Sequence, residues 1–129
     1  MKIQARFWID KDSKSYLGSG RITLLKFIQS EGSISGAAKK MRMSYKAAWD
    51  NLNQIKDLGG SPLIESNNGG VGGGGTSLTR EGERAIEIFD HLQKVGRDFF
   101  DFFNGCENLE ELEERLKKAQ ILIENFKKE

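Results

Sequence analysis

The sequence predicts a mainly α-helical protein with a small amount of β-structure. Apolar residues recur at three- and four-residue spacings over most of the chain, with serine, threonine or asparagine where these runs begin and glycine where several end. An alternating stretch near the N-terminus and two short β-prone stretches beside a glycine-rich tract are the exceptions. With 129 residues, the chain fits one domain with an appended helical region.

Composition argues against several classes of function. No apolar run approaches the ~20 residues needed to cross a bilayer, and the first residues lack an export signal, so we expect a cytoplasmic protein. One cysteine, Cys106, and one histidine, His91, leave few groups for a zinc site or a Ser-His-Asp arrangement. No pair of carboxylates stands in a plausible cleft. We therefore expect no enzyme, no metal and no cofactor.

The net charge of +1 conceals an asymmetry along the chain. Residues 1–60 carry 11 Lys and Arg against 5 Asp and Glu, whereas residues 61–129 carry 9 against 14. Neutralisation of phosphates supplies most of the sequence-independent affinity for nucleic acid. The basic half is therefore where a polyanion is expected to bind.

The first elements follow from two different periodicities. Apolar and polar residues alternate from Ile3 to Ile9, which predicts a half-buried strand that ends at a polar turn over residues 10–15. From Gly20 the spacing becomes helical, and Glu31-Gly32 closes the run as a glycine C-cap does.

Two further helices are predicted next. Ser33 or Ser35 can cap a second helix, in which the small residues 36–38 allow a neighbouring helix to come close. Ser44 can cap a third helix that ends at about Leu58. Two such helices joined by a short turn form a helix-turn-helix motif. The inward stripe of the third helix is predicted to contain Tyr45, Ala48, Trp49, Leu52 and Ile55.

A hairpin is predicted after the third helix, with residues 63–65 and 76–78 as its strands. A P-loop is excluded because no Gly-Lys-Ser/Thr follows, and a dinucleotide-binding loop because a second strand intervenes. Three helices followed by a hairpin is the order of a winged helix, whose glycine-rich tip can lie along a sugar-phosphate backbone. A hairpin loop without a partner is the alternative. The predicted wing comprises Asn67, Asn68, Gly69, Gly70, Val71, Gly72, Gly73, Gly74 and Gly75.

Two helices are predicted after the hairpin. Thr79 can cap a long one, and Asn108 with Glu111 resembles a capping box at the start of the last. We therefore expect a winged helix-turn-helix domain over residues 1–79 and a helical region over residues 80–129. Its apolar surface exceeds what a lone domain can bury, which predicts a homodimer. The predicted dimer contacts are Ile86, Phe89, Leu92, Phe99, Phe103, Leu112 and Leu116.

Three stretches carry a resemblance to a known family. GSGRITLLKFI, GSISGAAKKMRMSYKAAWDNL and GGVGGGGTSLTREGE closely resemble the N-terminal DNA-binding domain of the ModE family, molybdate-responsive transcriptional regulators whose winged helix is related to that of LysR regulators. The resemblance covers roughly residues 3–103. It implies a dimer in which the helix from Ser44 enters the major groove and the helix from Thr79 pairs two subunits. Val71 departs from the family, which usually has a basic residue there, and the family's full-length members continue into a molybdate-binding region.

We therefore expect a regulator that binds double-stranded DNA at a palindromic operator and lacks a molybdate-binding domain in this chain. Lysine and arginine would contact phosphates, while the start of the third helix reads base edges. A protein-interaction adaptor on the same scaffold is the alternative, and an unidentified regulatory protein or ligand is a further expected partner. Oxyanion binding at a helix start is a third, weaker hypothesis. The candidate DNA-binding residues are Ser33, Ser35, Lys39, Lys40, Arg42, Ser44, Tyr45, Lys46, Ala47, Asp50 and Asn51.

Overall fold

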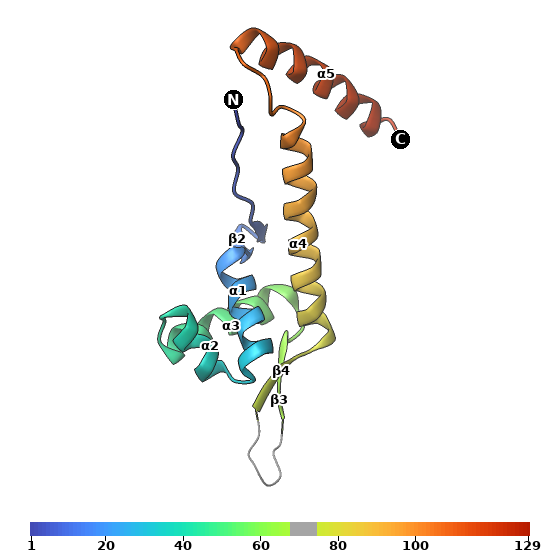
Figure 1. Cartoon of the computed structure of the whole chain (residues 1–129). Helices are drawn as coiled ribbons and strands as arrows, with labels where there is room; N and C mark the ends of the chain where they lie inside the picture. The colour runs from blue at the N-terminus through green and yellow to red at the C-terminus, as the bar shows by residue number, and fades with distance from the viewer. Residues whose placement is uncertain (68–74) are drawn as a thin grey trace. The chain divides into compact units, whose positions relative to one another are not determined.

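The computed structural model describes residues 1–67 and 75–129 (Figure 1). These residues form two compact units, one of residues 7–92 and one of residues 1–6 together with 93–129. The predicted mainly α-helical fold with small β-hairpins is confirmed. The elements are β1 (Ile9–Lys11), β2 (Lys14–Leu17), α1 (Ser19–Glu31), α2 (Ile34–Met41), α3 (Tyr45–Gly59), β3 (Ile64–Asn67), β4 (Gly75–Leu78), α4 (Arg80–Asp101) and α5 (Leu109–Lys127).

The N-terminal strand differs from the prediction. Sheet pairing begins only at Ile9, where β1 pairs antiparallel with β2, so the strand predicted over residues 3–9 is wrong. Asp12 and Ser13 make the turn with φ of 53° and 62°, the left-handed pair that a two-residue hairpin loop requires. Ile3 and Ile9 are nevertheless half-buried. The alternation of apolar and polar residues therefore reflects burial of one side of this segment and not pairing in a sheet.

The caps of the first three helices agree with the sequence. Gly32 ends α1 with φ of 72°, and its N–H donates to Ile28 O at 2.8 Å. Ser33, and not Ser35, caps α2, because its Oγ accepts from Gly36 N at 2.9 Å. Ser44 caps α3 in the same way. Hydroxyl caps of this kind satisfy amides that have no partner within the helix, so they fix where each helix begins.

A single apolar core holds the helices and the base of the second hairpin in the first unit. The small side chains of Ala37 and Ala38 are buried, which lets α2 approach α1 closely. On α3 the buried stripe is Ala48, Leu52 and Ile55. The core consists of Leu17, Ile22, Leu24, Leu25, Ile28, Ile34, Ala37, Ala38, Ala48, Leu52, Ile55, Leu63, Leu78, Ala85 and Phe89.

The predicted burial of two aromatic residues on α3 is wrong. Tyr45 is 56% exposed and Trp49 is 44% exposed. Both continue the spacing of the apolar stripe, but at 3.6 residues per turn they fall on its edge rather than at its centre. The neighbouring elements cover the centre, where Ala48 is completely buried.

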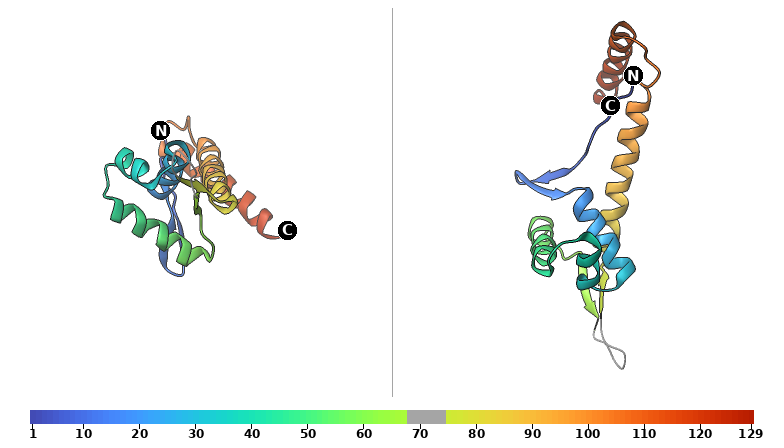
Figure 2. Two further views of the ribbon diagram at one scale, coloured as in Figure 1. Left: turned by 90° about the horizontal axis from the view of Figure 1, so that it is seen from below. Right: turned by 60° about the vertical axis from the view of Figure 1, so that its left-hand side comes forward.

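The second hairpin extends away from α1, α2 and α3 (Figures 1 and 2), as predicted for a wing. Its antiparallel register runs from Ile64 opposite Leu78 to Asn67 opposite Gly75. Thr76 N donates to Gly32 O at 2.8 Å, which joins β4 to the end of α1. Of the predicted wing residues, Asn67 and Gly75 are thus at the ends of the strands, while Asn68 to Val71 and Gly72 to Gly74 lie outside the described residues.

Thr79 connects the hairpin to α4, as predicted. Its Oγ1 accepts from Gly82 N at 3.1 Å and donates to Pro62 O at 2.9 Å, while its own N–H donates to Leu63 O at 3.0 Å. Thr79 therefore bonds to the residues just before β3, follows the last residue of β4 and caps α4. The first turns of α4 contribute Ala85 and Phe89 to the core of this unit.

The second unit contains the end of α4, α5 and the first residues of the chain. Asn108 Oδ1 caps α5 by accepting from Glu111 N at 2.9 Å, and Glu111 Oε2 accepts from Glu107 N at 2.8 Å, which confirms the predicted capping box with a shift of one residue in the return bond. The N-terminal ammonium of Met1 donates to Cys106 O at 2.7 Å. No helix in the described ranges is long and apolar enough to span a membrane.

Two of the predicted dimer contacts are corrected. Phe89 and Phe103 are each 1% exposed, because their rings fill the interior of the two units of the single chain. Their side chains therefore have no surface left for a second copy. Ile86, Leu92 and Leu112 are half-buried, whereas Phe99 and Leu116 are exposed. Further exposed apolar residues, not predicted, are Ile88, Val95, Phe102, Leu109, Ile121, Leu122 and Phe126.

Candidate nucleic-acid interface

A tight turn between α2 and α3 positions the candidate interface. Arg42 has φ of 56°, in the left-handed region that ends many helices. Its N–H donates to Lys39 O at 3.1 Å, and Met43 N donates to Ala38 O at 3.0 Å. These two bonds close α2 and redirect the chain, so that Ser44 starts α3 two residues later. The predicted helix-turn-helix is therefore present.

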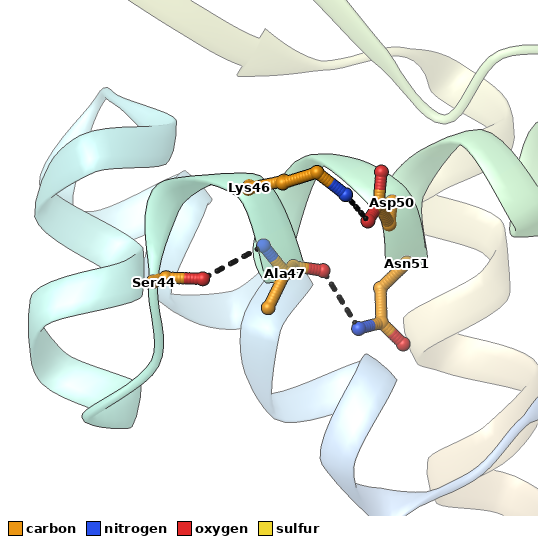
Figure 3. Close-up of polar contacts among 5 residues, drawn as sticks. All are labelled: Ser44, Lys46, Ala47, Asp50 and Asn51. Carbon is orange, nitrogen blue, oxygen red and sulfur yellow. Dashed lines mark hydrogen bonds and ion pairs between the residues drawn. The ribbon is translucent and has the colours of Figure 1, made fainter.

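The first two turns of α3 present four side chains on one exposed side. Tyr45 and Trp49, Lys46 and Trp49, and Lys46 and Asp50 are three or four positions apart, which makes the members of each pair neighbours on the helix surface. Lys46 Nζ lies 3.0 Å from Asp50 Oδ2, and both side chains project outward from α3 (Figure 3). The Lys46 side chain is 87% exposed. An exposed pair of this type contributes only about 0.3–0.5 kcal/mol, so Lys46 can readily exchange Asp50 for a phosphate or a base.

Asn51 and Ala47 form hydrogen bonds within the protein and do not belong to the exposed side of α3. Asn51 Nδ2 donates to Ala47 O at 2.8 Å, and the amide group lies on the other side of α3 from Lys46 (Figure 3). Asn51 Oδ1 accepts from Arg21 Nε at 2.9 Å. Ala47 N donates to the Ser44 cap at 3.0 Å. These groups are thus used to hold the start of α3 in place.

Arg21 is a residue of this site that the sequence prediction missed. Its guanidinium donates to Asn51 and Gln54 on α3, and its Nη1 donates to Ser15 O at 2.7 Å and to Tyr16 O at 3.0 Å on β2. Burial lowers the pKa of Arg21, although an arginine stays charged at any usable pH. A cation in the first turn of a helix interacts unfavourably with the helix dipole. The position of Arg21 in the sequence could therefore have indicated that it bonds to other elements.

Cations border the start of α3. Lys39 and Lys40 lie in the last turn of α2, and Arg42 lies in the turn itself, so all three are within five residues of Ser44 along the chain. All three side chains are exposed. Lys40 Nζ is 3.8 Å from Glu31 Oε1, a distance at the limit of an ion pair. Among the serines, Ser35 is exposed on α2, while the Oγ atoms of Ser33 and Ser44 are used in caps.

Comparisons with known proteins show what the helix-turn-helix region is similar to. Residues 21–83 match the family described as bacterial regulatory helix-turn-helix protein, lysR family. The transcriptional regulator ModE of Yersinia pestis is 44% identical over 101 residues, which cover 78% of this chain and 35% of the relative. The DNA-binding transcriptional dual regulator ModE of Escherichia coli K12 is 40% identical over 109 residues, covering 84% of this chain and 42% of the relative. The chain thus spans well under half of the length of these relatives.

Solved structures align more weakly. A LysR family transcriptional regulator has a TM-score of 0.47 and 19% identity, over 64% of this chain and 27% of that chain. A mutant of Lactococcus lactis ZitR in complex with DNA has a TM-score of 0.46 and 22% identity, over 97% of this chain and 85% of that chain. The resemblance to ModE regulators that the sequence predicted is confirmed at the level of sequence. Residues 21–83 are therefore similar to the helix-turn-helix domain of the lysR family, and the chain as a whole is similar to part of the ModE transcriptional regulators.

Proposed function

We propose that this protein is a transcriptional regulator that binds double-stranded DNA through α2, α3 and the β3–β4 wing. The observation that carries the proposal is the exposed start of α3 with its border of four cations, Lys39, Lys40, Arg42 and Lys46, and no acidic residue over residues 39–46. An α-helix fits the major groove, which is about 12 Å wide. Relatives with the same domain are described as transcriptional regulators.

The candidate residues divide into three roles in this proposal. Lys39, Lys40 and Arg42, with Ser33 and Ser35 at the start of α2, contact phosphates and set the position of the domain. Tyr45, Lys46, Trp49 and Asp50 face the bases. Ser44, Ala47 and Asn51 support α3 rather than read sequence. The strands β3 and β4 contact the sugar-phosphate backbone beside the groove.

We also propose that two copies bind a palindromic operator. Apolar residues of α4, half-buried at Leu92 and exposed at the other positions, recur at alternating steps of four and three, which is the spacing of a coiled-coil seam. A two-fold pair of α3 helices matches a palindrome whose half-sites lie one helical turn apart. Sedimentation velocity at micromolar concentration is expected to show a dimer, and a monomer would exclude this arrangement. The seam consists of Ile88, Leu92, Val95 and Phe99 on α4 and of Phe102 in the turn just after it.

The regulated genes belong to the proposal as well. One relative, 43% identical over 69% of this chain, is described as the molybdenum transport protein ModE of Azotobacter vinelandii. We propose that the operator of this protein lies near genes of molybdenum metabolism and that the protein acts in the cytoplasm.

Retention of genomic DNA fragments by the purified protein tests the function. Fluorescence anisotropy of a retained fragment is expected to show affinity that falls linearly with the logarithm of salt concentration. Lys46→Ala should weaken this binding and, if Lys46 contacts a phosphate, reduce the salt slope by about one. Lys117→Ala is the matched control, because Lys117 is also an exposed lysine in an i,i+4 ion pair, with Glu113 on α5. A wild-type protein that retains no fragment, or shows no salt dependence, would refute the proposed function.

Replacing Arg42 with glycine is expected to separate stability from DNA binding. The left-handed φ of 56° disfavours any residue with a Cβ, so glycine should raise the free energy of unfolding by about 0.5 kcal/mol. The same change removes a phosphate contact, so the affinity for the retained fragment should fall and its salt slope should decrease by about one. Urea denaturation and anisotropy at several salt concentrations measure the two effects. Unchanged affinity would remove Arg42 from the interface.

A further inference from the structure

The start of α3 exposes two large aromatic side chains one helical turn apart. Tyr45 is 56% exposed and Trp49 is 44% exposed, and their i,i+4 spacing places them side by side. Polar groups around them already have partners: Ser44 Oγ is used in the cap, Asn51 is held by Arg21 and Ala47, and Lys46 pairs with Asp50. The aromatic pair is therefore the main apolar contact surface on this part of α3.

The charges around the pair indicate the kind of molecule that covers it. Four cations and no acidic residue occur over residues 39–46, which lead directly into this surface. An acidic or nucleic-acid partner matches this environment, whereas an apolar protein partner would bring no charge to compensate it. Asp50, which follows Trp49 on α3, is paired with Lys46. The exposed apolar residues of α4 differ, because several acidic residues lie among them, including Glu87, Asp98 and Asp101.

We propose that Tyr45 and Trp49 read thymines by contact with their 5-methyl groups in the major groove. This inference rests on the proposed function. The 5-methyl group of thymine is the apolar group that the major groove presents, and apolar side chains recognise it there. Lys46, which lies next to Tyr45, can at the same time reach a phosphate or a guanine edge. The aromatic pair thereby favours thymine over cytosine at the bases that it contacts. Nearby polar side chains such as Asn51 already have hydrogen-bond partners within the protein.

The spacing of the two residues predicts the spacing of the thymines. Four residues of α-helix advance about 6 Å, and successive base pairs are about 3.4 Å apart along the duplex. Tyr45 and Trp49 would therefore reach methyl groups about two base pairs apart within each half-site. This distance gives the experiment a defined pattern to find.

Replacement of single thymines by deoxyuridine in a retained DNA fragment tests the inference, because it removes the methyl group and keeps the pairing with adenine. Wild-type protein is expected to lose about four-fold in affinity at each of two positions per half-site, the loss that corresponds to one buried methyl group. Trp49→Ala should bind more weakly and lose the sensitivity at one position, and Tyr45→Ala at the other. Trp49→Phe, which keeps an apolar ring, should retain much of the sensitivity to deoxyuridine.

Trp8→Ala is the matched control, since Trp8 is 61% exposed but lies outside α3; it should keep the full response to deoxyuridine. If Trp49→Ala fails to fold, the fluorescence of Trp49 in a Trp8→Phe background replaces it, and DNA is expected to change the emission. Wild-type protein that binds DNA without any response to deoxyuridine, Trp49→Ala that keeps the full response, or unchanged emission would overturn the inference and leave the proposed function standing. Absence of binding by wild-type protein would instead refute the proposed function.

Discussion

Replacement of Gly82 by alanine is expected to lower the free energy of unfolding by about 3 kcal/mol, the upper end of the usual range for overpacking. A Cβ at this position would overlap Leu63 O and lie 3.3 Å from Leu78 Cβ. The backbone oxygen cannot swing aside as a side chain does, and it also accepts the 3.0 Å bond from Thr79 N that begins α4. The added methyl group must therefore push α4 away from the base of the β3–β4 hairpin.

Urea denaturation followed by circular dichroism measures this effect. Gly20→Ala is the matched control, because Gly20 also lies inside a helix and a Cβ there meets no atom within 4 Å. Alanine at that position is expected to be neutral or to stabilise by up to about 1 kcal/mol. Equal midpoints for the two variants would show that the contact between Gly82 and Leu63 does not limit the packing of α4.

Much of the fold was predictable because the signals are local. Ser33, Ser44, Thr79 and Asn108 each accept from an amide three residues further along the same helix. Such bonds depend on a few neighbouring residues, and the sequence contains all of them. The order of helices and hairpin, and with it the winged helix-turn-helix, follows from these boundaries.

The orientation of side chains was less predictable because it depends on distant residues. Tyr45 and Trp49 share the three- and four-residue spacing of the buried stripe with Leu52, so the pattern fits a wider stripe than the neighbouring elements cover. Phe89 and Phe103 carry the same ambiguity, since periodicity alone does not distinguish the interior of one chain from the surface between two. For the same reason the exposure of Trp49 and the supporting role of Asn51 follow from the tertiary contacts and not from the sequence pattern.

Arg21→Ala is expected to have the second largest effect, a loss of about 2 kcal/mol in the free energy of unfolding together with weaker DNA binding. The guanidinium connects β2, α1 and α3 through donors to Asn51, Gln54 and two backbone carbonyls. Charged hydrogen bonds are individually strong, but the burial that lowers the pKa of Arg21 opposes them, and partly exposed acceptors regain water when it is removed. The net loss is therefore smaller than the number of bonds suggests.

Arg84→Ala is the control, because this exposed arginine pairs only with Glu81 in the contacts described, at 3.2 Å, and its loss should change stability by less than about 0.5 kcal/mol. A double-mutant cycle with Asn51→Ala should show coupling with Arg21, since the two side chains are in contact. Arg21→Lys should restore little, because a lysine cannot form the fork that reaches β2 and α3 together.

DNA affinity distinguishes a positioning role for Arg21 from a purely stabilising one. At a temperature where Arg21→Ala is fully folded, lower stability alone leaves affinity unchanged. If Arg21 sets the angle at which α3 leaves the core, affinity for the specific fragment should still fall, while the salt slope stays the same because no phosphate contact is removed. A folded variant with wild-type affinity would show that the caps of α2 and α3 suffice to aim the helix, and Arg21 would then serve stability alone.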